Sequence, residues 1–82
     1  MASTNGIGAH YHALVIMQNG TVHRVATKQT AEQCATYLAL RFTPPLWNEA
    51  RVRRDLIKIG TVEIEDDKSL IVESCNDVCC HI

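Results

Sequence analysis

The sequence predicts an α+β domain in which two β-hairpins form a four-stranded antiparallel sheet and one main helix packs on one face of it, in the order β-β-α-β-β. Three observations predict this class. β-Branched runs flank an Asn-Gly pair near the N-terminus, helical periodicity follows over residues 30–42, and alternating apolar residues lie over residues 56–74. The strand order stays open, because the connection through Pro44 and Pro45 can place the second hairpin at either edge.

The first hairpin is predicted from the runs YHALVIM and TVHRVAT, which stand on either side of the Asn-Gly pair at residues 19–20. Asn-Gly favours a two-residue type I′ turn, because both central residues of that turn need a positive φ. A turn centred on this pair places Ile16 opposite His23. The same register places Leu14 opposite Val25.

The main helix is predicted over TAEQCATYLALRF. Thr30 is a natural N-cap, and Gln33 three residues later completes a capping box that satisfies the free backbone donors of the first turn. Pro44 and Pro45 end the helix, because proline removes a donor and restricts the residue before it. We expect Cys34 to be a small buried residue of the apolar face, which consists of Ala31, Cys34, Ala35, Leu38 and Phe42.

Two further elements complete the expected order. Residues 48–55 form a short helix or an irregular segment, with Asn48 as its cap. The second hairpin has its loop at residues 66–68 and places Ile64 opposite Leu70. A bulge near Gly60 would bring the apolar residues just before it onto the same face of the sheet.

The chain of 82 residues is predicted to form a single domain over residues 10–75, with residues 1–9 as a flexible lead-in and residues 76–82 as a cysteine-rich tail. A chain of this size buries only roughly 60% of the surface that it exposes when unfolded, so the core is thin. The N-terminal segment lacks the basic and apolar parts of a secretory signal, and no apolar run approaches the ~18 residues of a transmembrane helix. We therefore expect a cytoplasmic protein, without membrane contact, whose cysteines are reduced.

The tail CNDVCCHI contains ligands of the types that tetrahedral zinc accepts. These candidate metal ligands are Cys75, Cys79, Cys80 and His81. Their spacing is a poor match, because the adjacent residues Cys79 and Cys80 diverge and seldom reach one metal. Completion of a site from elsewhere, for example by His10 and His12 on one face of the first strand, is geometrically easier but has no support in the sequence. An ordinary tail of reduced thiols is therefore the preferred interpretation.

Two other interpretations apply to the same tail. Cys79 and Cys80 followed by two residues resemble the Cys-Cys-x-x endings of Rab-type small GTPases, which implies a lipid anchor. However, the chain has no Gly-x-x-x-x-Gly-Lys loop, and His81 stands where a prenylation box is normally aliphatic. A disulfide between Cys34 and a tail cysteine would close a long loop, but a reducing cytoplasm opposes it.

Nucleic-acid binding is an alternative function for the basic stretch Arg51–Lys58, which holds four of the eight basic residues. These cations can neutralise phosphates, and the nearby Trp47 can stack on a base. The net charge of −1 opposes this interpretation. The charge is unevenly distributed: residues 1–58 contain seven basic and three acidic residues, and residues 59–82 contain one basic and six acidic residues.

Enzymatic activity is not predicted. The residue types that can serve as a nucleophile or a base occur outside any motif that fixes their mutual geometry. They are His10, His12, His23, Cys34 and Asp55.

The sequence is therefore interpreted as a small non-enzymatic protein-binding module, an adaptor or an inhibitor of a larger enzyme or complex, of the kind that phages and mobile elements encode. Arg and Trp dominate interface hot spots, and acidic residues can imitate the charge of a nucleic-acid backbone. One candidate contact surface is Trp47, Arg51, Arg53 and Arg54, and the other is Glu63, Glu65, Asp66 and Asp67. Because one copy leaves a thin core, a homodimer is a further expectation.

Overall fold

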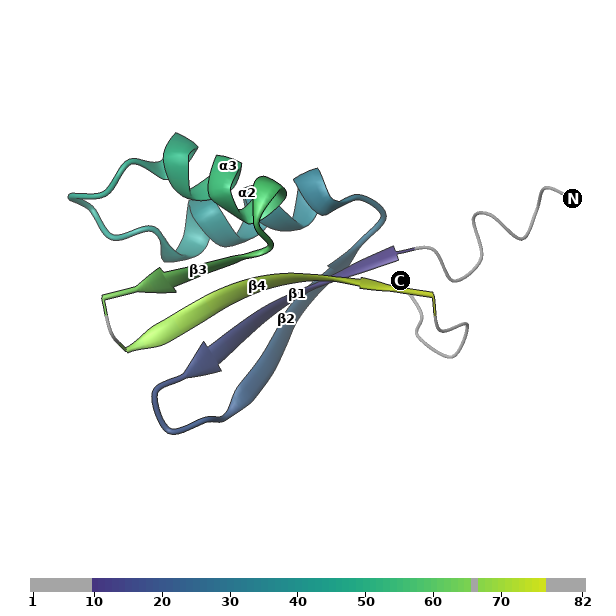
Figure 1. The fold of residues 1–82 in the computed structure, drawn as a ribbon, viewed down its shortest axis with the longest axis horizontal. Helices are drawn as coiled ribbons and strands as arrows, with labels where there is room; N and C mark the ends of the chain where they lie inside the picture. Colours follow the sequence, from purple (N-terminus) through teal and green to yellow (C-terminus); the bar gives the residue numbers. More distant parts are fainter. Residues whose placement is uncertain (1–9, 66, 77–82) are drawn as a thin grey trace, which may run out of the picture.

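The computed structural model describes residues 10–65 and 67–76. The elements are β1 (His10–Met17), β2 (Val22–Lys28), α2 (Ala31–Phe42), α3 (Glu49–Lys58), β3 (Thr61–Ile64) and β4 (Lys68–Cys75). The predicted α+β class, with one main helix and a shorter one, is confirmed (Figure 1). The predicted lead-in at 1–9 and the tail beyond residue 76 lie outside the described residues.

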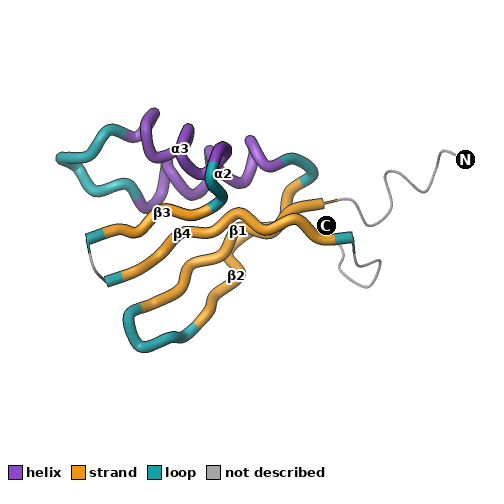
Figure 2. The backbone as a smooth tube through the Cα atoms, viewed as in Figure 1, coloured by secondary structure: helices purple, strands orange, loops and turns teal. Residues whose placement is uncertain are grey.

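The sheet has the strand order β2-β1-β4-β3, and all neighbouring strands are antiparallel. Both helices lie on the same face of this sheet (Figure 2). The first and last strands are its central pair, with His10 opposite Cys75 at one end and Met17 opposite Lys68 at the other. The second hairpin therefore joins the sheet through β4, which leaves β2 and the short β3 as the edges.

The turn of the first hairpin differs from the prediction. Its loop has three residues, 18–20, because the Met17 N–H donates to the Thr21 carbonyl and the Gly20 N–H donates to the Met17 carbonyl, each at 2.8 Å. Gly20 has a φ of 91°, whereas Asn19 does not have a positive φ. A type I′ turn requires positive φ at both positions, so the structure contains a three-residue loop with one left-handed glycine.

The longer loop shifts the register of β1 against β2 by one residue. Ile16 lies opposite Val22 instead of His23, and Leu14 lies opposite Arg24. The predicted pairing is therefore wrong near the turn. A bulge then shifts the register again, after which His12 pairs with Thr27.

The main helix α2 forms as predicted. The Thr30 hydroxyl accepts from the Gln33 N–H at 3.1 Å, and the Gln33 side chain accepts from the Thr30 N–H at 3.2 Å, which is a complete capping box. The helix ends at Thr43, whose backbone is extended before the two prolines. Its fully buried residues are Cys34, Ala35, Leu38 and Ala39.

The segment 48–55 is helical, and the helix α3 is longer than predicted. It begins after Asn48, whose side chain accepts from the Arg51 N–H at 3.1 Å, and it continues to Lys58. Val52 and Leu56 are one helical turn apart, and both are buried. Their spacing also permits an extended segment, but in the structure it places both side chains on the buried face of a helix.

Gly60 ends α3 instead of forming a bulge in a strand. Its φ of 96° follows the helical backbone of Ile59, the position at which a left-handed glycine commonly terminates a helix. The expected strand before Gly60 is therefore wrong, and β3 begins only at Thr61.

The β3–β4 loop consists of residues 65–67, with the Asp67 N–H donating to the Ile64 carbonyl at 3.1 Å. Ile64 lies opposite Lys68 instead of Leu70, a shift of two residues from the predicted register. A shift of two keeps every side chain on its predicted face. Ile64 and Leu70 therefore both face the core, although they do not pair with each other as predicted.

The core lies between the helix layer and the sheet and is mostly aliphatic and small. Its buried hydrophobic residues are Ala13, Val15, Cys34, Ala35, Leu38, Ala39, Val52, Leu56, Ile64 and Leu70. Tyr11 and Phe42 pack against it without full burial. The opposite face of the sheet and the outer face of the helices are the surfaces that remain for function.

Candidate functional site: a basic groove and a His–Cys cluster

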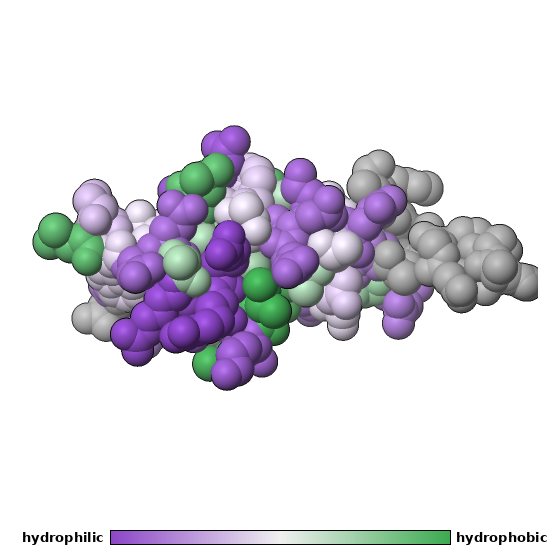
Figure 3. Space-filling view, turned by 90° about the horizontal axis from the view of Figure 1, so that it is seen from above, coloured by the Kyte–Doolittle hydropathy of each residue, from purple (hydrophilic) through white to green (hydrophobic). Residues whose placement is uncertain are grey.

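A shallow groove crosses the outer side of α2 and α3, facing away from the sheet (Figure 3). Side chains from both helices contribute, together with Lys28 at the end of β2. The lining residues are Lys28, Glu32, Gln33, Thr36, Tyr37, Leu40, Asn48, Ala50, Arg51, Arg53, Arg54, Ile57 and Lys58. We call this surface the basic groove.

The basic groove has a strong excess of positive charge, with Glu32 as its one acidic side chain against five basic ones. Arg54 has a long ion pair of 3.8 Å with Asp55. Within residues 10–65 and 67–76, Arg51 and Arg53 form no ion pair. Uncompensated cations that share a concave surface raise its potential and attract anionic partners.

Apolar side chains interrupt this charge. Leu40 is 68% exposed and Ile57 is 41% exposed, so each offers apolar surface to a partner. The half-buried ring of Tyr37 already has two cations near it, with Lys28 Nζ at 5.5 Å and Arg41 Cζ at 4.7 Å from its centroid. Figure 3 shows hydrophobic residues beside strongly hydrophilic ones on this face.

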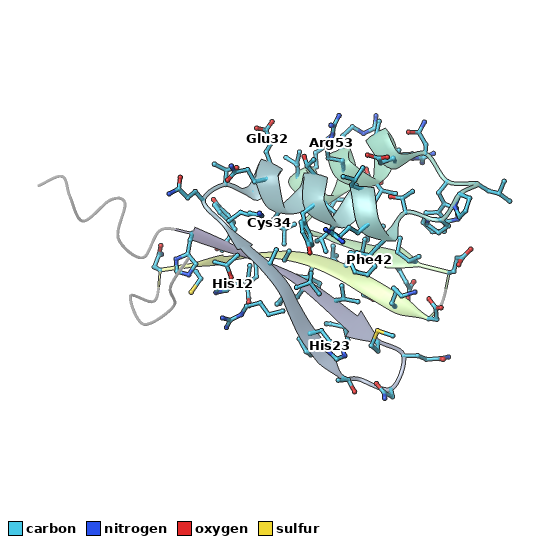
Figure 4. The ribbon with its side chains drawn as sticks, turned by 180° about the vertical axis from the view of Figure 1, so that it is seen from behind. His12, His23, Glu32, Cys34, Phe42 and Arg53 are labelled. Carbon is cyan, nitrogen blue, oxygen red and sulfur yellow. The ribbon has the colours of Figure 1, made fainter. Side chains whose placement is uncertain are left out.

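The three arginines of the predicted contact surface all line the basic groove, and Arg53 points away from the sheet (Figure 4). Trp47 is not one of the lining residues. It lies in the loop before α3, where its backbone N–H donates to the Pro44 carbonyl at 3.0 Å, and 37% of its surface is exposed to solvent. The structure therefore places the three arginines on one surface, and Trp47 lies beside that surface instead of lining it. Tyr37, Leu40 and Ile57 were missed, because their role depends on how the two helices pack.

The acidic candidate surface lies on the second hairpin, apart from the groove. Glu63 belongs to the edge strand β3, while Glu65 and Asp67 belong to the β3–β4 loop, and all three are exposed. Asp67 is partly neutralised by Lys68, whose Nζ lies 3.2 Å from its carboxylate. Asp66 lies outside the described residues.

A second cluster forms where the first strand begins and the last strand ends. His12 projects from the face of β1 that points away from the helices (Figure 4). His10, two residues earlier in the same strand, shares this face, and it pairs with Cys75 of β4. One ligand atom from each of the three residues lies within 4.8 Å of the other two. We call these residues the His–Cys cluster.

The two histidines are closely packed and buried. His10 is 2% exposed and His12 is 4% exposed, and their ring centroids lie 4.9 Å apart with an edge-on geometry. The Nε2 atoms of both rings are buried without a hydrogen-bond partner among the described residues. His12 Nδ1 lies 3.0 Å from the Thr27 hydroxyl oxygen. Burial, assisted by Arg24 and by His10, lowers the pKa of His12 and favours its neutral ring.

Of the four metal ligands predicted from the tail, Cys75 is described and belongs to the His–Cys cluster. The others, Cys79, Cys80 and His81, lie outside the described residues. The alternation of strand residues predicts that His10 and His12 share a face. Their approach to Cys75 depends on the pairing of β1 with β4, which the sequence left open.

The remaining nucleophile and base candidates are dispersed. Cys34 is fully buried under α2, and burial raises the pKa of its thiol. His23 is exposed on the edge strand β2, and Asp55 is half-buried on α3. The structure does not bring these three side chains together.

The chain matches no protein-family model, no curated protein and no solved structure. In the described part of the chain, neither helix has the length and apolar character needed to cross a membrane.

Proposed function

We propose that the protein is a non-enzymatic binding module whose basic groove docks a segment of a partner protein that carries both acidic and apolar side chains. The observation that supports this most directly is the composition of the groove, five basic residues and one acidic residue around exposed Leu40 and Ile57. Cations select for acidic residues and steer the encounter, while buried apolar contacts supply affinity. An adaptor or an inhibitor of a larger complex works in this way.

A protein partner is favoured over nucleic acid for two reasons. A nucleic-acid surface usually combines cations with aromatic faces that are open to bases, but the Tyr37 ring is already contacted by Lys28 and Arg41. Exposed Leu40 and Ile57 have no counterpart on a phosphate backbone. The formal net charge of −1 also differs from the basic excess that is typical of nucleic-acid-binding domains.

The proposal is tested by reversing the charge of the groove. In the variant R51E/R53E/R54E, we expect the affinity for the protein partner to fall by at least about 30-fold, because loss of hot-spot contacts costs about 2 kcal/mol or more. The three positions are exposed, so the fold should be retained. Affinity capture from nuclease-treated host lysate identifies the partner, and calorimetry with the purified partner measures the loss.

The matched control is R51K/R53K/R54K, which keeps the charge and should keep most of the affinity. E63K/E65K tests the acidic surface of the second hairpin and should leave binding at the groove intact. Equal capture by the glutamate and lysine variants would exclude the groove as the docking surface. Retention of nucleic acid alone from untreated lysate, lost after nuclease treatment, would replace the proposal by the nucleic-acid alternative.

Three wider expectations accompany this proposal. A protein partner fits a cytoplasmic location, in which the cysteines would be reduced, and a short chain with a docking groove fits a protein encoded by a phage or another mobile element. Self-association into a homodimer stays a prediction, and sedimentation at micromolar concentration tests it.

A further inference from the structure

The His–Cys cluster contains an arrangement that the basic groove does not use. It lies on the opposite side of the sheet from the helices, and its two imidazoles are almost completely buried. Buried polar atoms normally have a hydrogen-bond partner, yet the Nε2 atoms of His10 and His12 have none among residues 10–65 and 67–76. Two buried imidazoles with unpartnered ring nitrogens, each with a ligand atom within 4.8 Å of that of Cys75, suit a metal ion.

We propose that His10, His12 and Cys75 form a zinc site that joins the beginning of β1 to the end of β4. The three ligand atoms lie within 4.8 Å of one another. Zinc binds imidazole nitrogen and thiolate sulfur at about 2.0 to 2.3 Å, so the ligands of one tetrahedral ion are roughly 3.3 to 3.8 Å apart. Metal binding therefore requires side-chain rotations that bring the ligand atoms closer together.

The neighbouring residues prepare His12 for this role. When its Nδ1–H donates to the Thr27 hydroxyl oxygen at 3.0 Å, the lone pair is on Nε2, the atom that has no protein partner. Such a second hydrogen bond fixes the orientation and the tautomer of a metal-binding histidine. Thr27 pairs with His12 across β1 and β2, so the strand register itself positions this support.

The chemistry of binding is balanced. The Cys75 Sγ–H bond is replaced by an Sγ–Zn bond and one proton passes to solvent, while each neutral imidazole donates the lone pair of its Nε2 atom. No electron is transferred. Two imidazoles and one thiolate are a donor set that suits zinc, and three protein ligands leave the fourth tetrahedral position for another donor such as water.

The test uses the full chain, stripped of metal with a chelator and titrated with ZnCl₂. We expect one zinc per chain, a higher thermal midpoint and release of one proton in weakly buffered solution. Cobalt(II) as a substitute probe should give a thiolate charge-transfer band. Zinc should also protect Cys75 of the unmodified chain from alkylation, as measured by peptide mass spectrometry, and this readout needs no variant.

Variants locate the site. H10Q/H12Q should bind zinc at least 100-fold more weakly, whereas H23Q, which changes an exposed histidine on β2, should bind like the parent chain. T27V should lose about 10- to 100-fold in affinity and T27S much less, because serine keeps the hydroxyl. Circular dichroism confirms that the variants are folded.

Two results would overturn the proposal. One is an unmodified chain that shows neither stoichiometric zinc nor zinc-dependent protection of Cys75. The other is zinc binding that survives in H10Q/H12Q but disappears in C79S/C80S/H81Q, which would assign the metal to the tail.

Discussion

At the scale of single residues, the predictions that succeeded depend on local chemistry. Thr30 and Gln33 form their capping box because both partners lie within one helical turn. Cys34 is buried because its position in the helical period puts it on the core face. His10 and Cys75 could not be associated in this way, because they are 65 positions apart and meet only through the pairing of β1 with β4. Residues whose role depends on distant pairing are the ones that sequence reasoning missed.

The buried thiol of Cys34 predicts a pH dependence of stability. Burial raises its pKa above the ordinary value of 9.0, so the unfolded chain ionises this thiol at a lower pH than the folded chain does. The stabilising contribution is therefore fully present below about pH 9 and is lost as the pH rises through the folded pKa. Urea unfolding between pH 7 and pH 10.5 measures this loss.

C34A supplies the control, because it has no thiol but keeps a small apolar side chain in the helix. At pH 7 we expect it to be less stable than the parent chain by about 1 kcal/mol, a typical effect of a buried truncation. The difference in the free energy of unfolding between the two chains should become smaller as the pH rises above 9, because only the parent chain has the thiol. A stability difference that stays constant up to pH 10.5 would contradict the assignment of this pH dependence to the Cys34 thiol.

At the scale of elements, the sequence predicted the type of each helix and hairpin better than its boundaries. The segment before Gly60 alternates in a way that permits a strand, yet Val52 and Leu56 bury as a helical pair and carry α3 to Lys58. Both predicted hairpin registers were wrong because turn geometry fixes the register of a hairpin. The first loop has three residues instead of two, and the second has three residues as predicted but lies one position earlier, at 65–67. The shift of two in the second hairpin kept its inward face, whereas the shift of one in the first required a bulge.

Gly60 provides the test of how α3 ends. Its φ of 96° is unfavourable for a residue with a side chain, whereas an added Cβ would meet only the Val72 carbonyl oxygen, at an ordinary 3.8 Å. We therefore expect G60A to lower the free energy of unfolding by roughly 1 to 2 kcal/mol through backbone strain and not through a clash.

G60N is the matched control, because asparagine tolerates the left-handed region better than alanine, and it should cost less. Thermal unfolding ranks the three chains, since 1 kcal/mol shifts the midpoint by about 4 to 8 °C for a domain of this size. A G60A midpoint equal to that of the parent chain would show that this position carries no strain.

At the scale of the whole molecule, the layered α+β architecture separates two surfaces that the linear sequence only suggested. The basic groove is on the outer side of the helix layer, and the His–Cys cluster is on the far face of the sheet. The class of the fold followed from periodicity, but the strand order β2-β1-β4-β3 did not, because the long connection permits either edge. That order brings His10 and His12 close to Cys75, whereas the basic groove depends on how α2 packs against α3.

The central pairing of β1 with β4 predicts how zinc should change local stability. The cluster lies at one end of this pair, with His10 opposite Cys75, so a bound metal should suppress fraying there. In hydrogen exchange with and without zinc, we expect slower exchange of the amides at residues 11–13 and 73–75. The short edge strand Thr61–Ile64 pairs with residues 68–71 of β4, away from the cluster, so it is the internal control and should exchange at an unchanged rate. If zinc slows residues 61–64 as much as the ends of β1 and β4, the metal acts on the whole fold and does not clamp its first strand to its last.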